Sequence, residues 1–202
     1  MTLWRGKYPL ILASQSRARQ TLLANAGINF EAVPAELDER ALQQASGLSA
    51  PGDVAALLAR EKALAVSAQQ SGKFVVGADQ TLALGTRLFS KPAGRAQAAE
   101  QLRALAGRGH ELYSAVAVAH DGKILFEAAA VARMTMRRLG EAEIDAYLDQ
   151  AGEAVTSSVG AYQLEGLGVH LFERIEGDHF TILGLPLLPL LAFLRSQRLL
   201  NV

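Results

Sequence analysis

The sequence predicts an α/β fold in which a mixed sheet is flanked by helices. Short apolar runs of strand length alternate with stretches of helical periodicity along the whole chain. Half of the 202 residues are hydrophobic and a fifth are charged, so the chain can bury a sizeable core. No fixed-period repeat, charge block or Pro/Ser-rich linker marks a boundary between domains. We therefore expect a single domain over residues 1–202, which can hold two lobes around a cleft.

The first third of the chain predicts a strand, a helix, an extended segment and a second helix. The apolar run "LILA" after Pro9 indicates a buried strand, and the residues that follow indicate a helix that ends at Gly27. The segment "FEAVPAELDER" is expected to be extended and to run into an acidic turn. Residues 49–72 predict a helix that Asp53 caps, because its carboxylate can accept hydrogen bonds from the first turn, and that Gly72 ends.

The rest of the chain predicts two hairpins, three helices and a late strand. Gly85 is expected to turn the first hairpin and the Asp121-Gly122 pair the second, because both are favoured turn residues. Gly107 is expected to close the helix between them, and prolines to introduce the last helix. The predicted ranges are 73–92 for the first hairpin, 94–109 for a helix, 112–136 for the second hairpin, 139–152 for a helix, 166–178 for a strand and 185–200 for the final helix.

Composition excludes several classes of partner and site. Lysine plus arginine and aspartate plus glutamate both number 20, so no net charge draws the molecule to a nucleic acid polymer or an anionic membrane. The absence of cysteine excludes disulfides, thiolate zinc sites and cysteine nucleophiles, and fits a reducing compartment. No apolar run reaches the roughly 20 residues of a spanning helix. We expect a cytoplasmic protein with no membrane or nucleic-acid partner.

The joint between the first strand and helix, "ASQSRAR", is unusually polar. Backbone N–H groups at a helix start attract anions, and Ser14 and Ser16 add hydroxyl donors. Arg17 or Arg19 can add a planar guanidinium that binds phosphate or carboxylate with two parallel bonds. The residues equally allow Ser16 to cap the helix while both arginines lie in solvent. Neither a Walker loop nor a Rossmann glycine pattern is present.

A second polar feature is Asp79, which interrupts the apolar strand "KFVVGADQTLAL". A buried carboxylate is costly unless a cation or hydrogen-bond donors meet it. Lys91 lies at the end of the returning strand, roughly beside Asp79, and Lys62 lies on the preceding helix. The residues allow either an ion pair that holds the hairpin or a metal or water site. The turn "LDER" adds Asp38 and Glu39, although such a turn is usually only a solvated surface.

The motifs, taken in order, resemble the Maf family of nucleotide pyrophosphatases. They are "LILASQSRARQTLL", "DER", "REKA", "VGADQ", "KP", "AEQLRALAGRGHELYSAVAV" and "GAYQLEGLGVHLFERIEGD", followed by "GLPL". The resemblance extends from Leu10 to about Pro186. It implies a two-lobed fold with a central cleft, like that of the inosine-triphosphate pyrophosphatases, and usually a homodimer. It also implies hydrolysis of a nucleoside triphosphate between the α and β phosphorus atoms, aided by a divalent metal cation, Mg²⁺ or Mn²⁺.

The resemblance assigns roles to particular residues. Asp79 matches the proton acceptor and Glu39 the acidic residue on the metal side, and both would hold the metal. The remaining matches are cationic or hydroxyl groups that meet phosphate: the charge-neutralising Lys62 and Lys91, and the phosphate-binding Ser14, Ser16 and Arg19.

Four positions depart from the family pattern, and one of them, Ala18, is among the positions that select the base. Arg17 replaces the proline of the phosphate loop, Ser158 replaces a lysine before "VGAY", and Thr181 replaces an asparagine near "GLP". The loop keeps its donors but loses rigidity, and the other two changes bear on catalytic efficiency.

Ala18, Gln80 and Glu165 match the positions that select the base in the family. The branch that cleaves dTTP and UTP usually has Arg, Thr and Gln there. Gln80 and Glu165 instead resemble the 7-methyl-GTP branch, although that branch carries an aromatic residue where this chain has Ala18. A carboxylate can accept from N1–H and the exocyclic amine of guanine, and Gln80 is expected to add a mixed donor and acceptor. Alternatively, Glu165 only pairs with Arg174 or another cation.

Other functions stay open on the sequence alone. A sugar-nucleotide transferase also combines a phosphate loop with a "KP" lysine, but it usually has a glycine-rich loop, which is absent here. A regulator of cell division that binds nucleotide without turnover is the other alternative. No histidine partner accompanies Ser14 or Ser16, so we do not expect a serine nucleophile. The histidines are expected to be structural, because their spacing forms no metal-binding pattern; they are His110, His120, His170 and His179.

Overall fold

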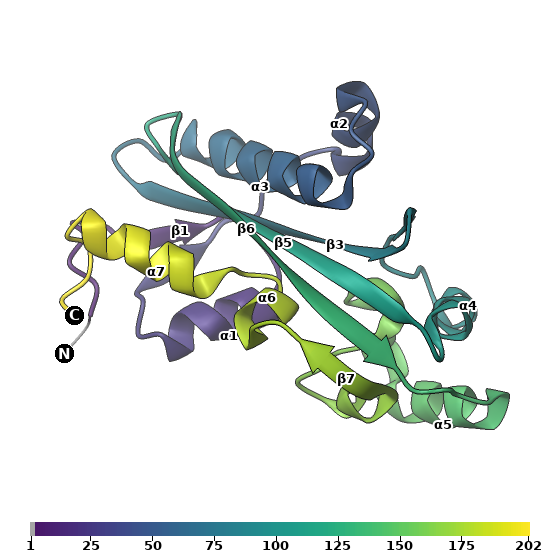
Figure 1. Cartoon of the computed structure of the whole chain (residues 1–202). Coiled ribbons are helices and arrows are strands. Elements are labelled where there is room, and N and C mark those ends of the chain that lie inside the picture. The colour runs from purple at the N-terminus through teal and green to yellow at the C-terminus, as the bar shows by residue number, and fades with distance from the viewer. Residues whose placement is uncertain (1–2) are drawn as a thin grey trace. The chain divides into compact units, whose positions relative to one another are not determined.

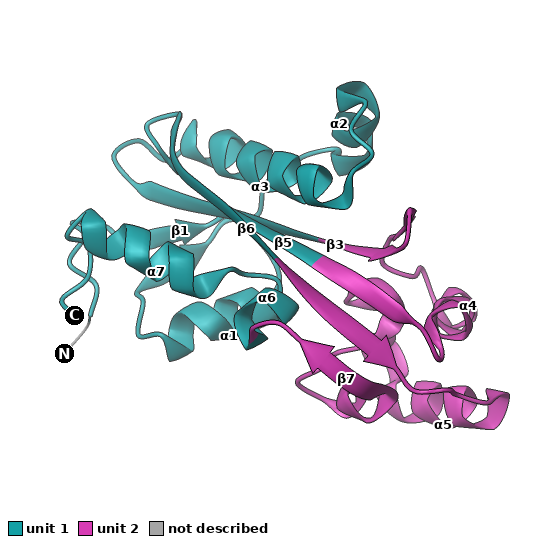
Figure 2. Cartoon of the chain, in the orientation of Figure 1, with its two compact units in different colours: residues 1–80, 113–130, 179–202 teal, residues 81–112, 131–178 magenta. Residues whose placement is uncertain are grey.

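The computed structural model describes residues 3–202 and confirms an α/β fold with a mixed seven-stranded sheet and flanking helices. The chain divides into two compact units, coloured separately in Figure 2. Unit 1 comprises residues 1–80, 113–130 and 179–202, and unit 2 comprises residues 81–112 and 131–178.

The helices and strands follow one another along the chain as labelled in Figure 1. In order they are β1 (Leu10–Leu12), α1 (Arg17–Asn25), β2 (Phe30–Ala32), α2 (Glu39–Ser46), α3 (Pro51–Ser67), β3 (Phe74–Leu84), β4 (Arg87–Phe89), α4 (Arg95–Leu105), β5 (Gly109–His120), β6 (Lys123–Met136), α5 (Glu141–Ala151), the 3₁₀ turns η1 (Gly152–Thr156), η2 (Val159–Ala161) and η3 (Leu167–Leu171), β7 (Phe172–Glu176), α6 (His179–Ile182) and α7 (Leu187–Ser196).

The sheet contains both parallel and antiparallel pairs. Its order is β2-β1-β3-β5-β6-β7, and β4 pairs with β3 outside this path. β1 runs parallel to β2 and β3, whereas β4 is antiparallel to β3 and β7 is antiparallel to β6. The parallel strand β1 is fully buried, which explains why its sequence is a continuous apolar run.

Unit 1 is built on a core of leucine and valine and a separate layer of alanine. The larger core joins β1, α1, β3, β5 and α7. Alanines of α3 and β5, among them Ala59, Ala63 and Ala117, form the second layer. At Gly77 of β3 an added Cβ would lie 2.1 Å from the backbone oxygen of Ala59 and 2.5 Å from the nitrogen of Ala63. Small side chains therefore let α3 approach β3 closely.

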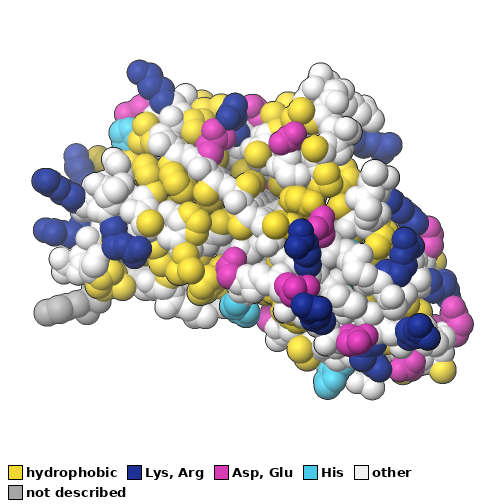
Figure 3. All heavy atoms as spheres, in the orientation of Figure 1, with side chains coloured by type: hydrophobic (Ala, Val, Ile, Leu, Met, Phe, Trp, Pro, Cys, Tyr) yellow, Lys and Arg dark blue, Asp and Glu magenta, His cyan; other side chains and the backbone are white. Residues whose placement is uncertain are grey.

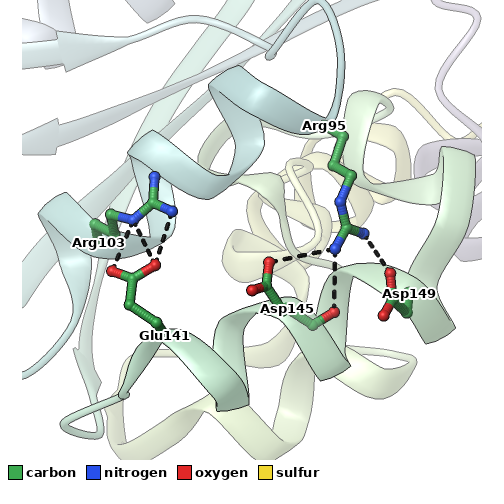
Figure 4. Close-up of polar contacts among 5 residues, drawn as sticks. All are labelled: Arg95, Arg103, Glu141, Asp145 and Asp149. Atoms are coloured by element: carbon green, nitrogen blue, oxygen red, sulfur yellow. Dashed lines mark hydrogen bonds and ion pairs between the residues drawn. The ribbon is translucent and has the colours of Figure 1, made fainter.

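In unit 2, ion pairs join α4 and α5 at the surface (Figure 4). Arg95 contacts Asp145 and Asp149, and Arg103 contacts both carboxylate oxygens of Glu141. Figure 3 shows basic and acidic side chains next to each other in this region. Exposed pairs of this kind contribute little to stability, so buried leucines of the two helices carry most of their packing.

The structure corrects two predictions in the first third of the chain. α3 begins at Pro51 after Ala50, so Asp53 lies inside the first turn and does not cap it; α3 also ends at Ser67, before Gly72. The acidic turn is the start of α2, whose N-cap Asp38 accepts a hydrogen bond from the Ala41 N–H at 2.9 Å. α2 has only eight residues and buries none of them, so it is too short and too exposed for its sequence to stand out as a core-facing helix.

Later elements follow the predictions more closely. Gly85 and the Asp121-Gly122 pair turn the two hairpins with positive φ angles, as expected. The predicted strand at 166–178 begins instead with η3 and is a strand only in β7. The final helix is shorter than predicted and follows the single turn α6. Within residues 3–202, none of the helices has the length and apolar character needed to cross a membrane.

Candidate active site

The loop before α1 presents a hydroxyl group that is oriented to donate. Ser16 caps α1, because its hydroxyl oxygen accepts a hydrogen bond from the Arg19 backbone N–H. Capping by Ser16 was one of the two alternatives that the sequence allowed. Ser14 Oγ accepts from the Ser16 N–H at 3.2 Å and from Arg19 Nη1 at 3.0 Å. Because both acceptor positions of this oxygen are used, its own proton must point to another acceptor. No described residue supplies that acceptor, so Ser14 can donate to an anion.

Arg19 ties this loop to two other segments of unit 1. Its side chain is buried, whereas Arg17 is exposed, so only Arg17 lies in solvent. Arg19 Nε donates to the Gly184 carbonyl at 2.7 Å, and Nη1 donates to the Ala78 carbonyl at 2.8 Å. Burial lowers the pKa of Arg19, while the nearby Asp79 and Glu39 act in the opposite direction. One guanidinium thus links the serine loop, the turn that follows α6 and the residue before Asp79.

Lys62 lies between two carboxylates. Its Nζ is 2.6 Å from Asp79 Oδ1 and 2.8 Å from Glu39 Oε1. Asp79 is 7 % exposed and Lys62 is 8 % exposed, whereas Glu39 reaches solvent. Burial raises the pKa of Asp79, although Lys62 and Arg19 both lower it. The helix α3 therefore supplies the cation that the buried aspartate needs.

The fold explains how these three side chains meet. Asp79 follows Gly77 on β3, and the close approach of α3 at that glycine brings Lys62 to the same place. Glu39 is the first residue of α2, which the structure positions against α3. In the described part of the chain no group of three His, Asp or Glu side chains could hold a metal ion. The two carboxylates do form a position that holds a cation, here the ammonium of Lys62.

Gln80 has a fixed amide orientation. Its Nε2 lies 2.9 Å from Ser114 Oγ and 3.0 Å from each of the Thr181 and Ile182 carbonyl oxygens. Carbonyl oxygens only accept, so the nitrogen must face them and the Oε1 atom must face away. The expectation of a mixed donor and acceptor is therefore corrected, because Gln80 offers a ligand only an acceptor.

Ser114 is a residue that sequence analysis did not single out. Its side chain is fully buried, and its hydroxyl donates to the Thr181 carbonyl at 2.7 Å. The same oxygen accepts from Gln80, so Ser114 fixes the orientation of the Gln80 amide. The sequence could have pointed to Ser114, because it is a polar residue in the otherwise apolar run "SAVAVA".

The remaining residues that the family resemblance singles out lie in both units. Lys91, Ser158 and Glu165 belong to unit 2, and Ala18 and Thr181 belong to unit 1. Lys91 is exposed two residues after the end of β4, and Glu165 is exposed two residues before η3. Arg174 pairs with Glu176 at 2.9 Å, so it is not the partner that was considered for Glu165. Ala18 is half-buried on α1. The two polar departures are also placed: the Ser158 hydroxyl donates to the Tyr162 carbonyl, and Thr181 is fully buried.

His110 is buried, and only one of its two ring nitrogens has a hydrogen-bond partner among the described residues. It is 2 % exposed, and its Nε2 lies 2.7 Å from the hydroxyl of Tyr162. Burial lowers the pKa of His110 to about 4, so the ring is neutral at pH 7.

Known proteins are similar to this chain over most or all of its length. A family model described as "Maf-like protein" matches residues 9–197. A protein of Bradyrhizobium diazoefficiens named nucleoside triphosphate pyrophosphatase is 74% identical over 202 residues, which is 100% of both chains. A relative of the same name from Rhodopseudomonas palustris is 70% identical over the same length. A Rhizobium meliloti protein named 7-methyl-GTP pyrophosphatase is 53% identical over 190 residues, or 93% of this chain and 95% of the relative.

Proposed function

The chain belongs to the Maf-like protein family, and from this premise we propose that it is a nucleoside triphosphate pyrophosphatase. It would cleave the anhydride between the α and β phosphorus atoms and release a nucleoside monophosphate and pyrophosphate. The observation that carries the proposal is the buried Lys62 ammonium held between Asp79 and Glu39. Relatives with the pyrophosphatase name match this chain over its full length.

Phosphate binding is assigned to the loop before α1. The Ser14 hydroxyl donates to a phosphate oxygen, because its lone pairs are already engaged by Ser16 and Arg19. The free N–H groups of the first turn of α1 add to this attraction. Arg19 keeps the loop in place through its three contacts and adds positive charge beneath the phosphates. The exposed Lys91 neutralises further phosphate charge, as the resemblance implies.

Asp79 is the general base in this proposal. It takes a proton from water as the water oxygen bonds to phosphorus and the bridging P–O bond breaks. Its raised pKa makes the carboxylate a stronger base than an ordinary aspartate. Lys62 has three N–H groups and uses two of them on Asp79 and Glu39, so the third can donate to a phosphate oxygen. Positive charge at this place stabilises the charge that develops in the transition state.

Asp79 and Glu39 are the side chains that would hold Mg²⁺ or Mn²⁺. Mg²⁺ is commonly bound by one or two carboxylates together with substrate phosphates, so a set of three protein ligands is not required. The ion would supply neutralising charge for the triphosphate. The ammonium that these two carboxylates already share supports a cation at this position.

Guanine-type triphosphates, 7-methyl-GTP foremost, are the proposed preferred substrates. Gln80 presents an acceptor, and Glu165 is an exposed carboxylate with no ion pair among residues 3–202. Each of these acceptors, taken by itself, suits a donor on the guanine edge, and methylation at N7 gives that base a positive charge that suits a carboxylate. The 53% identical relative named 7-methyl-GTP pyrophosphatase supports this choice.

A homodimer and a cytoplasmic location stay predictions. The elution volume on size-exclusion chromatography would test the homodimer, and cell fractionation would test the location.

A nucleotide panel with product analysis tests the proposed reaction. Protein incubated with Mg²⁺ or Mn²⁺ should release monophosphate and pyrophosphate in equal amounts. Asp79→Asn should lose about 100-fold or more in kcat, the scale of a general base, while its circular dichroism spectrum stays native. Glu36→Gln, a change at an exposed carboxylate of the same unit, should keep full activity. Orthophosphate as the primary product, or nucleotide binding without turnover, would contradict the proposal.

A further inference from the structure

We propose that Gln101 is a positioning residue that holds Lys91 and the segment leading to Glu165 in place. Gln101 lies on α4 and is 8 % exposed, on the helix face that also buries Ala98, Leu102 and Leu105. Its Nε2 donates to the Ser90 carbonyl at 2.8 Å, and its Oε1 accepts from the Gly160 N–H at 3.1 Å. One buried amide thus joins two loops of unit 2. The inference rests on the proposed function, because Lys91 acquires its role there.

The backbone of Lys91 is held from both sides by α4. Ser90, which Gln101 binds, directly precedes Lys91. Two residues beyond Lys91, the Ala93 N–H donates to Oε1 of Gln97, the other glutamine of the helix, at 2.8 Å. The Lys91 side chain itself is exposed. Its position is therefore set through the backbone, while its ammonium stays available for phosphate.

The second loop needs an outside partner for its backbone. Gly160 and Ala161 lie in the 3₁₀ turn η2 and have positive φ angles of 80° and 61°, and the Gly160 N–H donates to a side chain, Oε1 of Gln101. A Cβ at Gly160 would lie 2.6 Å from Cδ1 of Leu82, which shows how closely the turn is packed. A buried N–H without an acceptor is costly, and Gln101 supplies that acceptor. The turn leads within a few residues to Glu165.

Only an amide of this length can make both contacts, because it donates to a carbonyl and accepts from an N–H at the same time. Leucine at position 101 would fill a similar volume but leave Ser90 and Gly160 without partners. Glutamate would still accept from Gly160 but would place a carboxylate against the Ser90 carbonyl. We therefore expect Gln101→Leu to release both loops, and Gln101→Glu to release the Lys91 segment while keeping the Gly160 contact.

The first test is a double-mutant cycle with Lys91. Gln101→Leu should lower kcat roughly 10- to 100-fold, the scale expected for a misplaced catalytic group, with a smaller change in KM. In a Lys91→Ala background the same substitution should change kcat less than about twofold, because the group that it positions is gone. Leu102→Ala, which removes a buried side chain from the same helix, is the control. It should lower the melting temperature, and it should change kcat by the same factor with and without Lys91. Equal effects of Gln101→Leu with and without Lys91 would overturn the proposal.

The second test does not depend on turnover. Amide hydrogen exchange should accelerate in Gln101→Leu at Gly160 and in the peptide around Lys91, but not in α5. In Gln101→Glu the Gly160 amide should stay protected. Unchanged exchange at both loops would overturn the inference even if the protein hydrolyses nucleotides. A different result would separate the two proposals. If the wild-type protein shows no turnover but Gln101→Leu still accelerates exchange at both loops, the proposed function is refuted and Gln101 remains a loop-positioning residue.

Discussion

The ammonium of Lys62 lies 2.6 Å from the carboxylate of Asp79, and both side chains are about nine-tenths buried. Such a pair gains Coulomb energy but carries the desolvation cost of two charges, so it need not make the fold more stable than an apolar pair would. Lys62 also offsets part of the rise in the pKa of Asp79 that burial causes, and so favours the charged carboxylate that the proposed reaction would require.

The first prediction concerns the removal of that cation. Lys62→Met keeps the length of the side chain but leaves Asp79 buried without its nearest partner. The free energy of unfolding should fall by roughly 3–5 kcal/mol, the usual cost of breaking a buried pair. Urea denaturation measures this loss. Lys73→Met serves as the matched control, because Lys73 forms a longer, 3.6 Å pair with the more exposed Glu31. The double variant Lys62→Met with Asp79→Asn should recover part of the loss; no recovery would contradict the coupling.

The second prediction concerns pH. Burial raises the pKa of Asp79, and the neighbouring Lys62 and Arg19 reduce that rise. A base acts in its deprotonated form, so kcat/KM should fall as the pH falls through a value above the ordinary aspartate pKa of about 3.9. In Lys62→Met the pKa of Asp79 should rise further, so the fall of the residual kcat/KM on the acid side of the pH profile (the acid limb) should begin at a still higher pH. An acid limb that both proteins share would contradict the assignment.

The same shift has a consequence for stability. Between the unfolded and the raised folded pKa of Asp79, the folded protein binds more protons than the unfolded chain. The contribution of Asp79 to the free energy of unfolding therefore decreases as the pH rises through this window. Asp79→Asn should lack this decrease, which denaturation at a series of pH values would show.

The serine loop, the Asp79 strand and the two hairpin turns could be predicted from the sequence, because each depends on neighbours along the chain. The contact of Lys62 with Asp79 could not, because it depends on how closely α3 packs on β3. The exposed helix α2 could not be predicted because it has only eight residues and buries none of them, and its start is what places Glu39 beside Lys62. Gln101 could have been noticed as a polar residue on the apolar face of α4.

The third prediction tests the close packing of α3 on β3. Gly77→Ala places a methyl group 2.1 Å from the Ala59 oxygen in the present geometry, so the helix or strand must move. Overpacking of this kind usually costs about 1–3 kcal/mol, which thermal and urea unfolding would measure. Because Lys62 lies on the displaced helix, kcat should fall in the protein that remains folded. Gly94→Ala is the control, because nothing lies within 4 Å of a Cβ there and its φ is extended. A stable, fully active Gly77→Ala protein would contradict the packing argument.

The fourth prediction concerns base choice. If Glu165 accepts from the guanine edge, Glu165→Gln exchanges a carboxylate for a neutral amide that offers one acceptor and two donors. The preference in kcat/KM for 7-methyl-GTP over dTTP or UTP should shrink by roughly 1–3 kcal/mol, the size of a charge-assisted hydrogen bond. Glu173→Gln, at another exposed carboxylate of unit 2, should leave that preference unchanged. Ala18 offers no aromatic surface for stacking, so an aromatic residue there should raise kcat/KM for guanine-type substrates. Equal kcat/KM values for all bases, in wild type and in Glu165→Gln alike, would show that Glu165 does not select the base.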